Sequence, residues 1–426
     1  MHKTRIATYE NGLLAMLFLA FGFVFFDRLA LSFLFPFIAR DLGLTHGQLG
    51  LLSSVVALMW AISGASVGAY SDRTGRRKPV LILTVVLFSL LSALSGAVGG
   101  FMTLLLFRAM MGFAEGPVCP IAQSLMVEAS TPSRRGLNMG LVQGSSAGLL
   151  GAVVGPPVIV GIALHYGWRD AFYVSCIPGL VLALALGRFV RPDTGSRAAR
   201  DGSATHSATA LSVVLGQRNI LLCVLISCMF LSWFVILISF APTFLIEVKH
   251  FSLATMSGVM SALGIGWVIW GFAVPALSDR IGRRRAMIIF SFVSALCPVA
   301  FLLCSNAVIL SVAVVLTYAG LGCFSLFMAT IPAETVPPHY VATALGTIMG
   351  VGELVGGFVA PTVAGFAADR FGLSVVMTIS TAGAVTAGLL SLWLRETAPL
   401  VARKVDCPVD GVLASTPEEL PAQLGN

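Results

Sequence analysis

Long apolar runs recur along almost the whole chain, and they constrain its fold more than any other feature. A helix that crosses a bilayer needs about 20 predominantly apolar residues. Only 11% of the 426 residues are charged, against about 25% in a typical soluble domain, so there is too little charge to cover a water-exposed surface. We predict an all-α membrane protein with twelve transmembrane helices, near 12–38, 47–70, 80–98, 101–128, 137–161, 169–189, 219–246, 254–277, 286–304, 307–333, 341–365 and 373–394.

The positive charges indicate how these helices are oriented. If both termini lie in the cytoplasm, 20 of the 26 Lys and Arg residues fall in cytoplasmic segments and only 4 on the opposite face. Cytoplasmic loops of membrane proteins carry such an excess of basic residues. We therefore expect a multi-pass protein of the cell (inner) membrane with both termini cytoplasmic. The net charge of +7 is a topology signal on this interpretation, not a nucleic-acid-binding surface.

The cysteines carry little functional information. Seven of the eight lie singly in apolar segments, where cysteine behaves as a small hydrophobic residue, and none has the spacing of metal ligands. We predict no metal, no cofactor and no disulfide framework. The sequence also shows no nucleophile arrangement or phosphate loop that would favour an enzyme.

The chain also repeats itself. Residues 71–77 read Ser-Asp-Arg-Thr-Gly-Arg-Arg and residues 278–284 read Ser-Asp-Arg-Ile-Gly-Arg-Arg, each after the second predicted helix of a half. Parallel repeats of this kind place a substrate site between the halves, near the bilayer midplane. We predict an N-terminal six-helix bundle at 1–190, a cytoplasmic linker at 191–218, a C-terminal six-helix bundle at 219–395 and a disordered cytoplasmic tail at 396–426.

Several motifs resemble those of a known transporter family. Residues 68–77 are similar to the cytoplasmic signature of the major facilitator superfamily. Residues 25–32, 108–117 and 167–169 resemble the first-helix, fourth-helix and fifth-loop motifs of its anion:cation symporters. The resemblance covers residues 12–395 and implies two six-helix halves around a central cavity. It also implies proton-coupled uptake of a small organic anion, such as a carboxylate, by alternating access, and we expect a monomer.

Five charged residues lie deepest in the predicted helices, namely Asp27, Arg28, Arg108, Glu115 and Glu353. Each costs about 2.5–3.5 kcal/mol at a helix centre on insertion scales, so we expect them to line a wet cavity. Arg108 and Glu115 are seven residues apart, which places them on one helix face, about 10.5 Å apart along the axis. The alternative is that Arg28–Asp27 or Arg108–Glu115 are ion pairs that only hold helices together.

The chemistry of these residues suggests their roles. Arg28 is permanently charged and its planar fork matches a carboxylate at two points, so we predict that it binds the substrate together with Arg108. A carboxylate on Arg28 would withdraw the positive charge that holds Asp27 ionised, and Glu115 has apolar neighbours. We therefore expect Asp27 and Glu115 to couple proton binding to anion binding.

Four further residues are predicted to contact the substrate. Phe25 shares a face of the first helix with Arg28, while Trp60 and Gln143 resemble substrate-contacting positions of the family. Trp60 could equally face lipid or pack against a neighbouring helix. Two positions depart from the family: Phe25 stands where Tyr is usual, and Glu353 where a neutral polar residue is expected. A substrate with fewer hydroxyls than a sugar acid, with a donor group facing Glu353, therefore fits as well.

Opposite charges gather at the predicted cytoplasmic rim of each half. We expect them to act as a gate that favours the outward-open state, the alternative being that the arginines only set topology. The residues are Asp72, Arg73, Arg76 and Glu128 in the first half and Asp279, Arg280 and Glu334 in the second.

The main alternative function is a proton-driven exporter of a drug or metabolite with the same fold. The fifth-helix signature of such exporters ends in Gly-Pro-x-x-Gly-Gly. Here Gly155 and Pro156 are followed by Ile159 and Val160 at the positions of the final glycines. Two central arginines also favour an anion over a cation, so the sequence favours anion uptake.

Overall fold

The computed structural model describes residues 2–131, 134–191, 213–337 and 340–398, with side chains given for all of these except 2–8, 72, 136 and 342. Within these ranges twelve helices are long and apolar enough to cross a membrane, which confirms the predicted number and order of spans. Of the predicted linker and tail, residues 192–212 and 399–426 lie outside the described residues.

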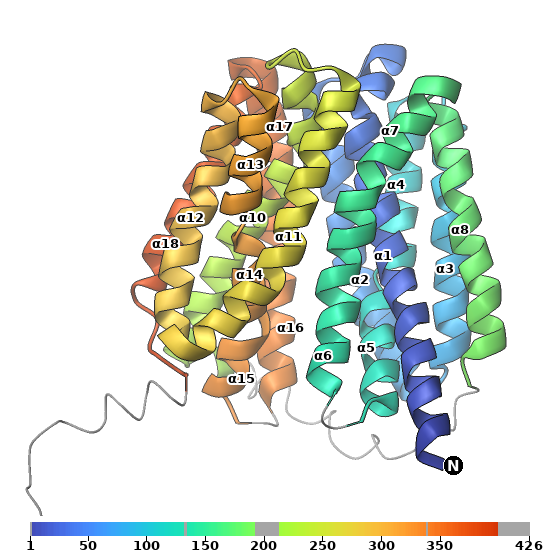
Figure 1. Ribbon diagram of the computed structural model, residues 1–426, viewed down its shortest axis with the longest axis vertical. Coiled ribbons are helices and arrows are strands. Elements are labelled where there is room, and N and C mark those ends of the chain that lie inside the picture. The colour runs from blue at the N-terminus through green and yellow to red at the C-terminus, as the bar shows by residue number, and fades with distance from the viewer. Residues whose placement is uncertain (1, 132–133, 192–212, 338–339, 399–426) are drawn as a thin grey trace, which may run out of the picture.

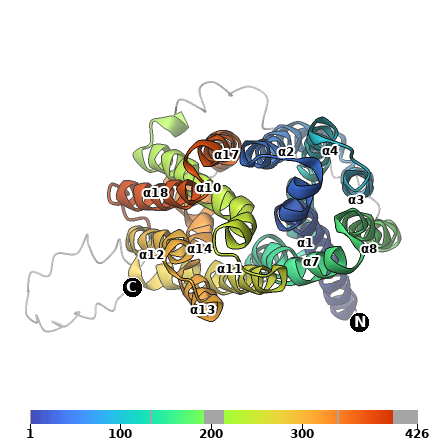
Figure 2. The same ribbon diagram turned by 90° about the horizontal axis from the view of Figure 1, so that it is seen from above.

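The helices form two bundles that lie side by side (Figure 2). The first bundle contains α1 (His2–Leu42), α2 (His46–Thr74), α3 (Arg77–Ser95), α4 (Phe101–Glu115), α5 (Val118–Ala129), α6 (Arg135–Gly140), η1 (Leu141–Ser145), η2 (Ala147–Val154), α7 (Gly155–Tyr166) and α8 (Trp168–Phe189). The second contains α10 (Arg218–Glu247), α11 (Leu253–Ile281), α12 (Arg283–Leu303), α13 (Ala307–Thr317), α14 (Gly320–Ser325), η4 (Leu326–Thr330), α15 (Ile331–Thr335), α16 (Val341–Gly352), η6 (Glu353–Val359), α17 (Ala360–Phe371) and α18 (Ser374–Ser391).

Several helices run beyond their predicted ends. The first span reaches Leu42 rather than residue 38, and the eleventh reaches Phe371 rather than residue 365. The headgroup regions extend a bilayer of about 30 Å to about 40–45 Å, and helices continue through them with polar residues. Apolar length therefore marks the hydrocarbon part of each helix but not its ends.

Three spans contain π-helical segments, which hydrophobic patterns do not reveal. They are η1 and η2 in the fifth span, η4 in the tenth and η6 in the eleventh. A π-turn widens the helix and re-aims the side chains that follow, and such segments occur often at functional sites. Gln143 lies in η1, and Glu353 is the first residue of η6.

The two halves approach closely near the upper end of the molecule as drawn in Figure 1, opposite the N-terminus. A Cβ atom added to Gly50 of α2 would lie 2.3 Å from the main-chain oxygen of Pro361 in α17. One added to Gly264 of α11 would lie 2.4 Å from the backbone of Ala152 in η2. Glycine is needed at both crossings because the backbones leave no space for a side chain.

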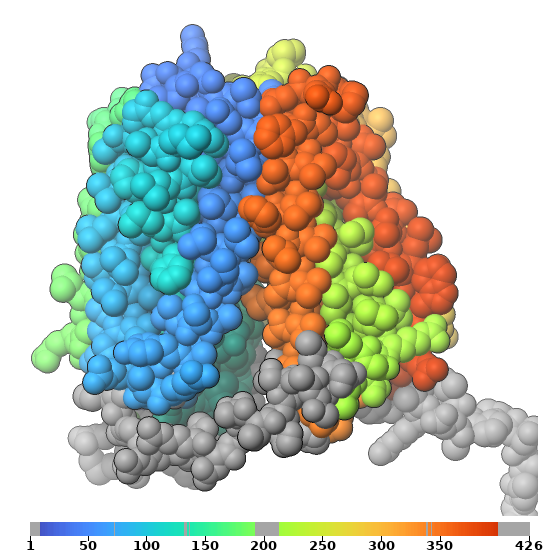
Figure 3. Space-filling model, turned by 180° about the vertical axis from the view of Figure 1, so that it is seen from behind, coloured from blue at the N-terminus to red at the C-terminus, as the bar shows by residue number. Residues whose placement is uncertain are grey.

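The halves separate toward the lower end. In the space-filling view the blue first half and the orange second half meet in the upper part of the molecule, and a gap lies between them lower down (Figure 3). The structure is therefore closed at the upper end and open at the end that carries the N-terminus.

Candidate functional site

Arg28 lies on α1, at the interface between the two halves. Its guanidinium carbon is 5.8 Å from the ring centre of Phe25 and 5.7 Å from that of Trp60. Among the described residues its side chain makes no hydrogen bond or ion pair. A partly buried guanidinium without a hydrogen-bond partner among the described residues has all five of its N–H donors available for a ligand.

Arg108 of α4 is fixed in a different way. It is 1% exposed, and its Nη2 donates to the main-chain oxygen of Arg28 at 2.9 Å. Its Nη1 makes a longer contact of 3.5 Å with the main-chain oxygen of Asp27. Arg108 therefore binds the backbone of α1, and it supports the helix from which Arg28 projects.

Asp27 faces away from Arg28. It is buried, and its Oδ1 accepts a hydrogen bond of 3.0 Å from the hydroxyl of Ser92 on α3. The Ser92 hydroxyl is in turn 2.9 Å from that of Ser175 on α8. Asp27 thus lies inside the first half, among α1, α3 and α8, whereas Arg28 faces the second half.

Glu115 ends α4, where Gly116 and Pro117 interrupt the span. A Cβ at Gly116 would lie 2.4 Å from the main-chain oxygen of Trp60, so this glycine lets α2 and α4 touch. Glu115 is fully buried, and neither of its carboxylate oxygens has a hydrogen-bond partner among the described residues. The charges of Arg28 and Arg108 act on it from a distance.

The two ion pairs that were the alternative to a functional role are not formed. Within the described part of the chain no salt bridge joins Arg28 to Asp27 or Arg108 to Glu115. The four charges are instead distributed over α1 and α4, with Arg28 and Glu115 lacking a direct partner. This arrangement leaves one donor group and one acceptor group without a protein ligand.

Glu353 belongs to the second half, yet the charge of Arg28 acts on it. It is 6% exposed, and its Oε2 has no hydrogen-bond partner in the described residues. Its side chain runs along the glycine face of its own helix, because a Cβ at Gly357 would lie 2.4 Å from Oε2. A Cβ there would also lie 3.0 Å from the Cβ of Ala57 in α2, so Glu353 sits close to the interface of the halves.

Trp60 and Gln143 occupy different surroundings. Trp60 is 7% exposed, which excludes a lipid-facing position, and its indole N–H has no partner among the described residues. Gln143 is half-buried, and its amide nitrogen lies 3.7 Å from the sulfur of Cys119. Only Trp60 of these two is in contact with Arg28.

Two aromatic residues of the second half complete the surroundings of Arg28, and the sequence did not point to them. Trp267 of α11 lies edge-on to Phe25 with ring centres 5.6 Å apart, and Phe234 of α10 lies edge-on to Trp267 at 5.3 Å. Both stand in apolar runs, where an aromatic residue is indistinguishable from a core or lipid-facing one.

A small cavity of about 30 Å³ lies between the halves at this point. Its walls include Phe25, Arg28 and Arg108 from the first half and Phe234 and Ser239 from the second. This volume is close to the space one water molecule takes in the liquid. The site is therefore nearly closed in this state.

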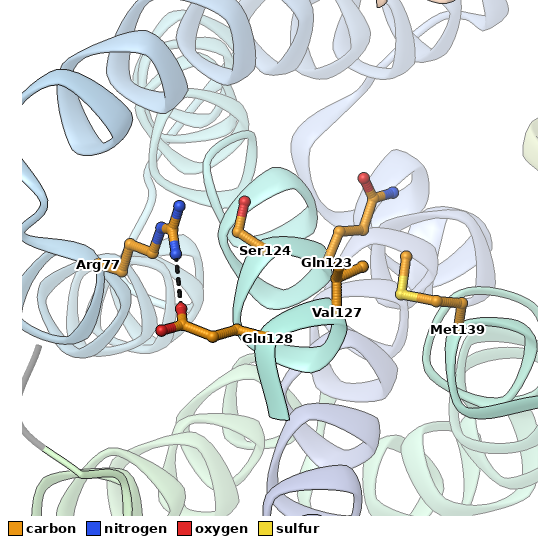
Figure 4. Close-up of a pocket in the computed structure, with 6 residues that line it drawn as sticks. All are labelled: Arg77, Gln123, Ser124, Val127, Glu128 and Met139. Atoms are coloured by element: carbon orange, nitrogen blue, oxygen red, sulfur yellow. Dashed lines mark hydrogen bonds and ion pairs between the residues drawn. The ribbon is translucent and has the colours of Figure 1, made fainter. Parts of the chain in front are cut away.

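Three acids of the predicted gate, Glu128, Asp279 and Glu334, pair within their own halves, with arginines that were not among the predicted gate residues. Arg77 donates to Glu128 at 2.9 Å beside a 410 Å³ cavity of the first half (Figure 4). Arg283 bridges Glu334 at 3.1 Å and Asp279 at 2.6 Å in the second half. Arg73, Arg76 and Arg280 form no ion pair with described side chains, and the Asp72 side chain lies outside those described.

A polar cluster joins the two halves at the upper end, and the sequence did not suggest it. Asp369 of α17 accepts hydrogen bonds of 2.9 Å from the backbone N–H groups of both His46 and Gly47 in the first turn of α2. The ring of His46 lies 3.2 Å from Asp369 and 2.9 Å from Glu247 of α10. A carboxylate at a helix N-terminus is stabilised by the free N–H groups and the helix dipole.

Comparison with known proteins places this architecture in a family. Residues 17–361 match the Major Facilitator Superfamily. The chain is 29% identical to a probable 4-methylmuconolactone transporter of Cupriavidus pinatubonensis, over 78% of each protein. It is 28% identical to a hexuronate transporter of Bacillus subtilis, over 84% of this chain and 87% of that protein.

A solved structure shows the same fold. It is a bacterial homologue of the human lysosomal transporter Spinster, in an inward-facing and unoccupied conformation. The TM-score is 0.74 at 19% identity, over 90% of this chain and 96% of that one.

Proposed function

The chain belongs to the major facilitator superfamily and is a membrane transporter, not an enzyme, and from this premise we propose that it takes up a small organic carboxylate together with protons. Uptake proceeds by alternating access through the inner membrane. The proposed unit is a monomer, because one chain supplies both halves of the site.

The unpaired guanidinium of Arg28 is the observation that carries this proposal. It projects from α1 toward the second half, and its hydrogen-bond donors are unused among the described residues. A substrate carboxylate is the ligand that matches such a planar fork. The relatives named as transporters of 4-methylmuconolactone and hexuronate support an organic acid as the cargo.

Nearby groups complete the proposed site. Trp60 offers its unpartnered indole N–H to the carboxylate, while Phe25 flanks Arg28 on the same helix. Arg108 contributes charge at the cavity wall and fixes α1. Gln143 and Glu353 lie farther out, on the π-helical segments η1 and η6, and would contact polar substituents of the substrate.

Proton coupling is assigned to Glu115, with Asp27 in support. Glu115 is buried, and the positive charge of Arg28 interacts with it electrostatically. When a substrate carboxylate neutralises Arg28, the ionised form of Glu115 loses that stabilisation, so anion binding and proton binding favour each other. Asp27 is bonded to Ser92 inside the first half, and it would respond through α1 rather than by contact with the substrate.

We assign the open lower end to the cytoplasm, which matches the excess of basic residues there. The structure then corresponds to an inward-facing state, held closed on the outer side by Asp369, His46 and Glu247. The proposed gate at the cytoplasmic rim would close in the outward-facing state. Its acids Glu128 and Glu334 are paired inside each half with Arg77 and Arg283, which we add to the proposed gate.

Counterflow in proteoliposomes tests the proposal. Vesicles loaded with one unlabelled carboxylate from a panel are diluted into the same labelled compound, and exchange is recorded for the wild type and for Arg28→Lys. We expect exchange of at least one carboxylate by the wild type and its loss in the variant. Exchange of cationic or neutral compounds only, unaffected by the variant, would contradict the proposal.

A further inference from the structure

The binding cavity has aromatic walls from both halves of the protein. Phe25 and Trp60 flank Arg28 from the first half. Phe25 and Phe234 line the cavity itself, and both keep some exposed surface. Trp267 of the second half contacts both Phe25 and Phe234, so aromatic residues of the two halves meet beside Arg28.

The rings of this cluster pack edge to face, which is a common arrangement of aromatic pairs. Trp267 meets Phe25 at 90° and Phe234 at 89°. The indole N–H of Trp60, a donor on a residue more than nine-tenths buried, has no partner among the described residues. A core packed only for stability would satisfy that donor. The unpartnered N–H beside Arg28 therefore indicates a place for a ligand.

The polar groups of the cavity are few. Besides Arg28 and Arg108, the polar side chains that line it in the described part of the chain are the hydroxyls of Ser32, Ser53 and Ser239. Three hydroxyls suffice to complete the hydrogen bonds of one carboxylate or of a single ring substituent. A sugar acid would bury several more hydroxyl groups, and each one left unpaired would weaken binding.

The small volume of the cavity favours a thin ligand. At about 30 Å³ it must expand before any carboxylate enters. A planar ring needs a slot only one aromatic layer thick, since stacked carbons lie about 3.5–4.0 Å apart. A puckered saturated ring requires more separation of the halves and cannot stack.

We infer that the transported anion is an aromatic carboxylate, with the carboxylate on Arg28 and the ring among Phe25, Trp60, Phe234 and Trp267. This inference rests on the proposed function and narrows its substrate to one class. Arg28 supplies the charge recognition, and the aromatic rings of the second half supply the selectivity for a π-system.

Calorimetric titration of the purified full-length protein with three sodium salts tests this inference. The probes are benzoate, cyclohexanecarboxylate of similar size but without a π-system, and glucuronate. We expect benzoate to bind roughly tenfold more tightly than cyclohexanecarboxylate, which is the range of an aromatic pair, and glucuronate to bind least. Trp267→Leu should remove most of the preference for benzoate over cyclohexanecarboxylate, whereas Trp393→Leu, an exposed residue, should preserve it.

The outcomes separate the two proposals. Equal binding of benzoate and cyclohexanecarboxylate, or tighter binding of glucuronate, with loss of binding in Arg28→Lys, would overturn the aromatic class and leave carboxylate transport standing. A benzoate preference unchanged by Trp267→Leu would also contradict the assignment of the rings. Failure of all three salts to bind, together with counterflow of cationic or neutral compounds only, would overturn the proposed function as well.

Discussion

The guanidinium of Arg108 donates a hydrogen bond of 2.9 Å to the main-chain oxygen of Arg28. One arginine thus fixes the backbone that carries the other. Arg108 is buried, and its guanidinium is hydrogen-bonded to the protein backbone. Arg28 is half-buried, and its side chain has no polar partner among the described residues. Two residues of the same type therefore differ in their surroundings, and Arg28 is the one that we propose binds the substrate carboxylate directly.

Arg28→Lys should weaken carboxylate binding by at least about tenfold while leaving thermal stability unchanged. Lysine keeps the charge but loses the fork, and hydrogen bonds to charged groups contribute about 1.5–3 kcal/mol. Titration calorimetry and thermal unfolding of the purified protein measure the two effects. Arg169→Lys is the matched control, because Arg169 pairs with Asp41 at the upper end, away from the cavity. Wild-type affinity in Arg28→Lys would remove it from the site.

Arg108→Lys should lower thermal stability more than it lowers the affinity for the anion. A lysine cannot reach both main-chain oxygens of α1 in the same geometry, so buried acceptors lose their donor at a cost of about 1–3 kcal/mol. We expect a clear fall in the thermal unfolding temperature, with weaker anion binding as a consequence. A variant of full stability that loses only affinity would show that Arg108 acts on the substrate directly.

Asp369→Asn should shift the protein toward the outward-open state. The change removes the negative charge that holds the first turn of α2 and the ring of His46 across the interface. A cysteine at Ser239, in the wall of the cavity, reports the opening when other cysteines are removed and an impermeant thiol reagent is added outside. We expect faster labelling in Asp369→Asn.

Asp41→Asn provides the control for that experiment. Asp41 also lies at the upper end and forms an ion pair of 2.6 Å with Arg169, but both residues belong to the first half. Its loss should leave the labelling rate of the cavity cysteine unchanged. Equal rates in wild type and Asp369→Asn would show that the contact does not hold the halves together.

The fold was predictable from sequence because hydrocarbon thickness sets a minimum apolar length for every span. The apolar pattern predicted all twelve spans. It did not predict where each helix ends, because polar residues continue the helices into the headgroup region. The π-helical segments were also missed. Gly148 of η2 lies at a close contact between the halves, because a Cβ there would lie 2.9 Å from Val268.

The residues of the candidate site that could be predicted from the sequence are the charged ones, because a charge inside a membrane costs free energy. Arg28 and Glu115 stand out in apolar runs because charge is expensive there. Trp267 and Phe234 give no such signal, since apolar residues are the background of the sequence. Asp369 and His46 were missed for another reason: their contact joins residues 323 positions apart and depends on how the halves meet.

The central claim is that one chain couples a carboxylate at Arg28 to a proton at Glu115, and Glu115→Gln tests it most directly. Glutamine resembles the protonated acid permanently, so exchange of substrate should persist while release of the proton is lost. The measurement compares counterflow with uptake driven by a pH gradient, in proteoliposomes of wild type, Glu115→Gln and Asp170→Asn, an exposed control. The account predicts that Glu115→Gln retains counterflow but accumulates no substrate against its gradient. Gradient-driven accumulation by Glu115→Gln at the wild-type level would contradict it.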